Sequence, residues 1–185
     1  MGVIYNFTGA DAIDQGADWF ANFIYNQPAL ITNITSDGTT VTYEAVNGFV
    51  ATQIVSISGV LPSQYNLTNV TVVTSNGNQF TVTNGATGVY ISGGYAYAPV
   101  NITGATAALQ LRSLPNDPDA VLTLTTENGG IGITGLTGEI AVHATAQQTR
   151  AIDEGYYYYD LELTAEGVVT RISQGQVLVS AEITR

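Results

Sequence analysis

Hydrophobic and polar positions alternate with a two-residue period through most of the last third of the chain. In the segment 155–164, GYYYYDLELT, Tyr and Leu fill the odd positions from 157 onward, whereas the even positions pass from tyrosine to acidic and hydroxyl residues. Successive side chains of a strand point to opposite faces of its sheet. The pattern therefore predicts an antiparallel strand with Tyr157 and Tyr159 in the core, and with Tyr156 and Tyr158 facing outward.

Two more strands and one short helix are predicted around this segment. The same alternation predicts strands at 168–172 and 177–184, and the second of them is expected at a sheet edge, where free backbone groups pair with a neighbour. Upstream, Thr145-Ala-Gln-Gln148 fits the S/T-x-x-E/Q capping box, which satisfies two free amides at a helix start. This motif predicts a helix at 146–152, closed by Gly155.

The rest of the chain reads as short strands separated by turns. Dipeptides such as Asp37-Gly38 and Asn47-Gly48 mark the turns. For 18–25 a helix is the alternative, because acidic residues recur there at helical spacing, but Gly16 and the aromatic content favour a strand. The other predicted strands are 39–44, 53–58, 69–74, 79–83, 89–91, 102–112, 121–125, 131–136 and 139–144. The predicted fold class is all-β with one short helix.

A change in composition predicts two domains. Residues 36–97 contain two acidic residues and no basic one, whereas the rest of the chain holds the other thirteen acidic residues and all four arginines. We expect 36–97 to form a small β-barrel-like domain, inserted into a discontinuous domain made of 1–35 and 98–185. The alternative is two consecutive domains. The strand around Trp19 argues against it, because that strand would have no sheet to join.

The sequence of the C-terminal block carries a resemblance. The pattern is a strand, a helix with the motif T-A-x-x-T from Thr145, the strand G-x-Y-x-Y-D-L-E-L, a glycine-containing turn, and the strand G-x-V-x-V-S-x-E-x-T-R. QGADW at Gln15 and NITGATAALQLR at Asn101 are similar to two earlier strands of the same pattern. Together these stretches resemble a family of tailed-phage virion proteins, of the upper-baseplate and tail-accessory type. The middle of the chain, around 48–83, resembles a small β module that recurs in phage tail and fibre proteins.

The resemblance implies an immunoglobulin-like β-sandwich with the small module inserted in it. It also implies a structural component of a virion, placed in the tail or baseplate as an adaptor or fibre-proximal protein. Capsid cement or head decoration is the first alternative, and a carbohydrate-binding module that contacts a host-surface glycan is the second. The expected partners are other virion proteins and copies of this chain, assembled in the host cytoplasm without a signal peptide.

Composition narrows the classes of partner. The chain has no cysteine and no lysine, and fifteen acidic residues against four arginines give a formal charge of −11. A nucleic acid or an acidic membrane surface needs clustered cations to neutralise its phosphates, so neither is expected as a partner. No apolar run reaches the length of a membrane span.

Four motifs were weighed as sites of chemistry. The stretch Gly130–Gly135 matches G-x-G-x-x-G, but strand-like sequence follows it where a nucleotide site needs a helix start. His143 is the single histidine, and catalysis or metal binding would need partners that the sequence does not place beside it. We expect a structural histidine. No enzyme activity and no cofactor are predicted.

Two pairs of carboxylates complete the candidates. Asp160 and Glu162 project from one strand face, as glycosidase carboxylates do, but an exposed strand shows the same pattern to water. Asp117 and Asp119 are oxygen ligands that suit Ca²⁺, but they lack the loop pattern of a dedicated site, so no metal site is predicted. The outward tyrosines of the same strand, Tyr156 and Tyr158, are the candidate interface.

Overall fold

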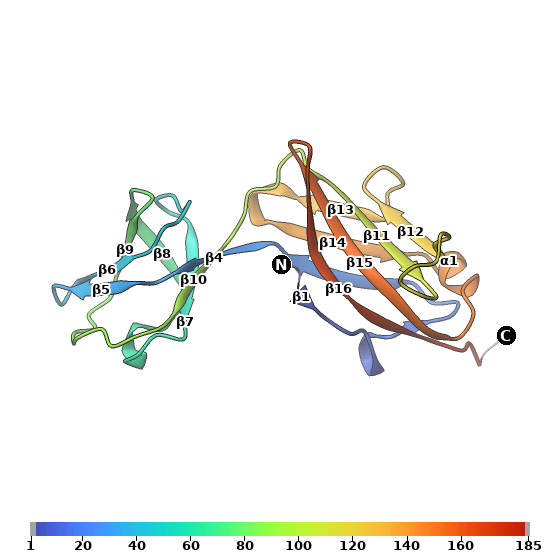
Figure 1. Cartoon of the computed structure of the whole chain (residues 1–185), viewed down its shortest axis with the longest axis horizontal. Helices are drawn as coiled ribbons and strands as arrows, with labels where there is room; N and C mark the ends of the chain where they lie inside the picture. Colours follow the sequence, from blue (N-terminus) through green and yellow to red (C-terminus); the bar gives the residue numbers. More distant parts are fainter. Residues whose placement is uncertain (1–2, 184–185) are drawn as a thin grey trace. The chain divides into compact units, whose positions relative to one another are not determined.

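The computed structural model describes residues 3–183 and consists mainly of strands (Figure 1). Within this range the structure has one α-helix, α1 (Ala146–Arg150), and three short 3-10 turns. The all-β prediction with one short helix is confirmed. None of the helical segments in the described range is long and apolar enough to cross a membrane.

The chain divides into two compact units. The discontinuous unit combines the chain up to Tyr25 with the chain from Asn101 onward, and the central unit is Asn26–Val100. Our sequence-based boundary after residue 35 falls inside strand β5 (Asn33–Ser36), which pairs with β6 (Thr40–Glu44) of the central unit. The strand before it, β4 (Asn26–Leu30), pairs with β10 (Tyr95–Pro99) of the same unit. Residues 26–35 therefore belong with the middle of the chain.

The larger sheet of the discontinuous unit has six strands, and β16 and β15 are its longest pair. The alternation predicted for β15 is present, since Tyr157, Tyr159, Leu161 and Leu163 are buried. The strands follow the order β1 (Val3–Ile4), β16 (Val168–Ser180), β15 (Gly155–Ala165), β11 (Thr106–Arg112) and β12 (Leu122–Thr125), with β2 (Ile13–Asp14) also paired to β16.

Two predictions about the C-terminal strand are wrong. The segments predicted separately at 168–172 and 177–184 are one strand up to Ser180, which stays paired with β15 across a register shift at Leu161/Glu162. This strand is not at a sheet edge, because β1 and β2 pair with it in parallel along its other side. Gly175 permits that approach, since a Cβ there would stand 1.9 Å from the Tyr5 carbonyl oxygen. Thr184, the last residue of the predicted strand, lies outside the described residues.

A three-stranded sheet completes the discontinuous unit, in the order β13 (Ile131–Thr134), β14 (Glu139–Ala144) and β3 (Trp19–Ile24). The strand prediction for 18–25 is confirmed, and β13 is shorter than predicted because a 3-10 turn, Gly135–Thr137, follows it. Phe7 joins the two sheets: its ring centroid lies 5.2 Å from that of Trp19 in β3 and 5.2 Å from that of Tyr159 in β15. The two sheets therefore share one aromatic core.

The chain passes between the two units twice, and both passages begin beside the same turn of the discontinuous unit. The Tyr25 amide donates to the Gly138 carbonyl at 2.8 Å, and the Ile102 amide donates to the Gly135 carbonyl at 2.8 Å. Tyr25 and Ile102, which flank the central unit in the sequence, are therefore bonded to opposite ends of the same four-residue turn, Gly135–Gly138.

The central unit is a strongly curved seven-stranded sheet, in the order β4, β10, β7 (Ile54–Ser58), β8 (Leu67–Ser75), β9 (Gln79–Thr83), β6 and β5. The two edge strands, β4 and β5, follow one another directly on the chain, so the short link between them connects the two edges of the curved sheet. Tyr43 and Phe80 stack in the core with centroids 5.0 Å apart, and the Tyr43 hydroxyl donates to the Tyr65 carbonyl at 2.9 Å.

One strand of the central unit was misplaced by the sequence analysis. The prediction of a strand at 89–91 is wrong: Val89 and Ile91 lie in an exposed loop, and only a single bridge, between Leu61 and Ser92, forms beside it. The strand comes later, at Tyr95–Pro99, after Gly93 and Gly94, both of which adopt positive φ.

The predicted capping box is present at helix α1. The Gln148 amide donates to the Thr145 hydroxyl, and the Gln148 side chain accepts from the Thr145 amide at 2.8 Å. The helix ends at Arg150, with Ala151 as its C-cap, two residues before the predicted end at Ile152. Thr149 ties the helix to the N-terminal segment, because its buried hydroxyl donates to the Ala17 carbonyl at 2.8 Å.

Candidate functional site: the outer face of the six-stranded sheet

The four consecutive tyrosines of β15 divide between two faces as predicted. Tyr157 and Tyr159 point into the core, where their hydroxyls bond to the Asp153 carbonyl at 2.9 Å and to the Ser173 hydroxyl at 2.8 Å. Burial raises the pKa of both phenols above the ordinary tyrosine value. Tyr156 and Tyr158 point outward and are 59% and 36% exposed. The strand therefore presents two aromatic rings to solvent from a sheet whose other face is the core.

A groove with a volume of about 660 Å³ lies on this outer face and includes Tyr158 but not Tyr156. Its floor is made by outward side chains of three neighbouring strands, and its walls by Ile4 and Asn6 on one side and Pro115 on the other. Register brings the floor together in cross-strand rows: Arg112, Tyr158 and Gln176 form one row, and Gln110, Asp160 and Gln174 the next.

Three of the four charged side chains of the groove are paired with one another. Arg171 lies 3.4 Å from the Asp160 carboxylate and 3.6 Å from the Glu162 carboxylate, and its guanidinium also donates to Gln174 at 3.0 Å. The two carboxylates share one face as predicted, and a single arginine bridges them. Each group is half-exposed, so solvent screens these pairs and they contribute little to stability.

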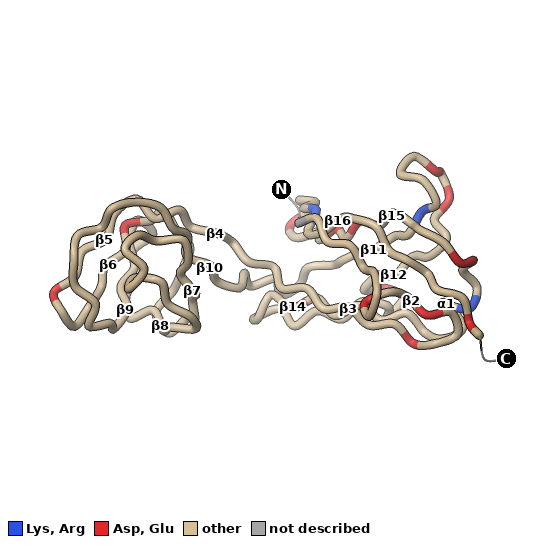
Figure 2. Tube along the Cα trace, turned by 90° about the horizontal axis from the view of Figure 1, so that it is seen from below, with Lys and Arg blue, Asp and Glu red and all other residues tan. Residues whose placement is uncertain are grey.

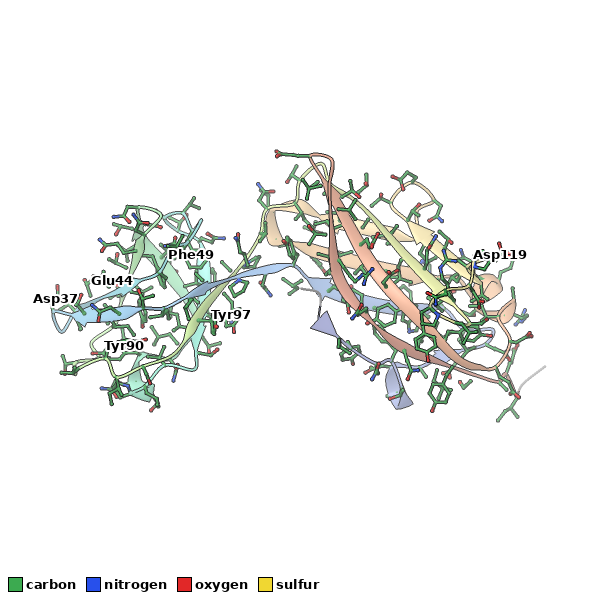
Figure 3. All side chains as sticks on the ribbon, in the orientation of Figure 1. Asp37, Glu44, Phe49, Tyr90, Tyr97 and Asp119 are labelled. Carbon is green, nitrogen blue, oxygen red and sulfur yellow. The ribbon has the colours of Figure 1, made fainter. Side chains whose placement is uncertain are left out.

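The second arginine of the groove is fixed by a loop. The Arg112 guanidinium donates to the Gln110 side chain at 2.7 Å and to the Asp117 carbonyl. The Asp117 carboxylate in turn accepts from the Leu114 amide at 2.9 Å, so this residue shapes the loop between β11 and β12. Asp119, labelled in Figure 3, lies in the same loop. Within residues 3–183, no three His, Cys, Asp or Glu side chains gather as metal ligands would.

The remaining sequence candidates lie in the three-stranded sheet. His143 projects from the outer face of β14, where its ring stacks on Phe20 with centroids 4.5 Å apart and its Nε2 lies 3.8 Å from the Asp18 carboxylate. Gly130–Gly135 contains strand β13 and runs into a 3-10 turn, so the α-helix start that a dinucleotide site requires does not follow it in the described structure. The structure does not bring these residues together with the groove residues.

Cationic residues are scarce in this protein, which makes their position informative. Of the four arginines, Arg112 and Arg171 both line the groove, while Arg150 pairs with Glu182 at 3.1 Å. The outer face of the six-stranded sheet thus combines exposed tyrosine, arginine and amide side chains in one concave area. Sequence reasoning found Tyr158, Asp160 and Glu162, but not the groove. The cross-strand neighbours depend on register, which a single strand does not specify.

No protein-family model matches the chain, and no curated protein matches it either.

Proposed function

We propose that this chain is a non-enzymatic structural component of a tailed-phage virion, which acts by assembly in the tail or baseplate as an adaptor or fibre-proximal protein. The resemblance to tail-accessory proteins supports this role, and parts of the pattern that carries it lie on α1, β15 and β16. In this proposal the discontinuous unit is an immunoglobulin-like β-sandwich. The core shared by the six- and three-stranded sheets supports that assignment.

The observation that carries the proposal is the set of residue types exposed on the outer face of the six-stranded sheet. Tyrosine and arginine are the residue types that protein interfaces favour, and this face holds Tyr156, Tyr158, Arg112 and Arg171. The groove holds two arginines and two carboxylates and is therefore close to electrically neutral overall; Arg171 pairs with both carboxylates, and Arg112 is bonded to neutral groups. We therefore assign the contact with other virion proteins, or with a second copy, to this face.

A virion map with the chain fitted into it tests the location. We expect few copies, at the tail, with the outer face of the six-stranded sheet covered by a neighbour. Many copies spread over the shell would instead support the capsid-cement role. A map in which only the central unit is docked, and the discontinuous unit is free of neighbours, would refute the assembly surface.

Substitution tests the surface directly. The double variant Tyr156→Ala/Tyr158→Ala removes two exposed rings, so the free protein should stay folded while its incorporation into particles falls. The matched control is a double substitution of two exposed tyrosines in the central unit, Tyr95 and Tyr97, which should leave incorporation unchanged.

A further inference from the structure

A second aromatic surface lies on the central unit. Strand β10 alternates buried alanines with Tyr95 and Tyr97, which are 44% and 37% exposed. Their ring centroids are 6.2 Å apart, and both rings stand on the outer side of the curved sheet. The outward positions of β10 and of its two neighbours β4 and β7 form what we call the tyrosine face: Pro28, Leu30, Ser56, Ser58, Tyr95 and Tyr97.

Register gives each ring the same kind of surroundings. Tyr95 lies between Leu30 and Ser58, and Tyr97 lies between Pro28 and Ser56. Each ring therefore has an apolar side chain on one side and a hydroxyl on the other.

The hydroxyl beside Tyr97 is held in place by a backbone irregularity. Ser56 accepts a hydrogen bond from the Asn69 amide at 3.1 Å, and its hydroxyl contacts the Asn69 side chain at 3.4 Å. Asn69 has φ of +53° beside a register shift between β7 and β8. Irregularities of this kind redirect side chains at the rim of a sheet. Here the irregularity places the Asn69 amide group beside the Ser56 hydroxyl.

The central unit is almost without charge. Residues 26–100 contain Asp37 and Glu44 as their only ionisable acids, and no Lys, Arg or His. Figure 2 shows the central unit without any Lys or Arg. Neither acid is on β4, β7 or β10, and Asp37 lies at the end of the unit far from Tyr97 (Figure 3). The central unit has no cationic side chain to pair with an anionic partner, and the tyrosine face has no carboxylate to pair with a cationic partner.

We propose that the tyrosine face binds a neutral polysaccharide, with one sugar ring stacked on each tyrosine. The C–H face of a sugar ring packs on an aromatic ring, and its hydroxyls reach the polar groups beside that ring. Ser56, Ser58 and Asn69 supply those donors and acceptors. A protein partner fits less well, since serine is depleted at protein interfaces and the face lacks arginine and methionine. The inference is independent of the virion role.

Affinity electrophoresis in native gels tests this binding, because the formal charge of −11 makes the full chain migrate. Gels contain one of four neutral polysaccharides (dextran, galactomannan, glucomannan or xyloglucan) or the anionic polygalacturonate. We expect retardation of the unmodified chain by a neutral polysaccharide. Tyr95→Thr/Tyr97→Thr keeps β-strand propensity and should weaken binding about tenfold or more. Tyr95→Phe/Tyr97→Phe keeps both rings and should still bind.

The chain supplies its own control. Phe20→Ala removes an exposed aromatic ring from the other unit and should leave retardation unchanged. Retardation by none of the four neutral polysaccharides, or by polygalacturonate alone, overturns the proposal. So does binding that survives in the threonine variant. If sedimentation shows that the threonine substitutions dissociate an oligomer, the face is a subunit interface and the proposal is likewise wrong.

Discussion

Truncation of Tyr159 should destabilise the discontinuous unit far more than truncation of its neighbour Tyr158. The Tyr159 ring is 4% exposed, packs 5.2 Å from Phe7, and bonds through its hydroxyl to the Tyr5 carbonyl and the Ser173 hydroxyl. Removing a buried aromatic side chain costs about 3–5 kcal/mol. Tyr159→Phe keeps the ring and loses the two hydrogen bonds, which costs about 1–2 kcal/mol. Tyr158→Ala should cost about 0.5 kcal/mol or less.

The assay is urea unfolding followed by tryptophan fluorescence. Trp19 is the only tryptophan of the chain, and it lies in the core of the discontinuous unit, edge-on to Phe7. Its emission therefore reports on this unit separately from the central one. With a slope of about 2 kcal/mol per molar urea, a loss of about 4 kcal/mol lowers the midpoint by about 2 M. Tyr158→Ala should hardly move it.

Equal losses at the two positions would refute this reasoning. The strand would then be buried on both faces, or its register would differ by one residue, which exchanges the faces of every side chain. A loss for Tyr159→Phe as large as that for Tyr159→Ala would also contradict it, because the ring would then contribute nothing beyond its hydroxyl.

Three other predictions concern separate parts of the molecule. Replacing 26–100 with a short Gly/Ser linker should leave a folded discontinuous unit, seen as the emission of a buried Trp19. Deleting only 36–97 should destabilise the protein, because β4 and β5 then lack their partner strands. Equal behaviour of the two deletions would contradict the unit boundaries. Thr145→Ala should lower the free energy of unfolding by about 1 kcal/mol through loss of the capping box, as measured by the same urea assay. Burial raises the pKa of Tyr43, so the stability of the central unit should be complete below about pH 10 and fall as pH rises above it. Circular dichroism across that range should show less alkaline loss in Tyr43→Phe.

Sequence reasoning was most accurate where one face of a strand is buried. The alternation in β15 predicted which tyrosines enter the core, and the capping box predicted the start of α1, because both signals are local. It failed for β4 and β10, where Pro28, Gly94 and Pro99 weaken the strand signal and pairing with distant segments decides the structure. Tyr95 and Tyr97 were missed for that reason.

The groove and the covered edge of β16 were beyond prediction for a different reason. The groove lining comes from β11, β15, β16, the N-terminal segment and a loop, and only the register of three strands brings these side chains together. The parallel pairing of β1 and β2 with β16 joins residues that are more than 160 positions apart. No periodic pattern within either segment specifies such a partner.

The pairing of the first strands with β16 has a consequence for biosynthesis. The chain leaves the ribosome from its N-terminus, and domains fold as their sequences become available. All strands of the central unit lie between residues 26 and 99, so this unit has its complete sheet while later segments are still being translated. Residues 3–14 emerge before it but must wait for β16, which ends at Ser180. A translating ribosome should therefore carry a folded central unit flanked by an exposed N-terminal segment, with Phe7 and Trp19 open to chaperones until the last strand is released.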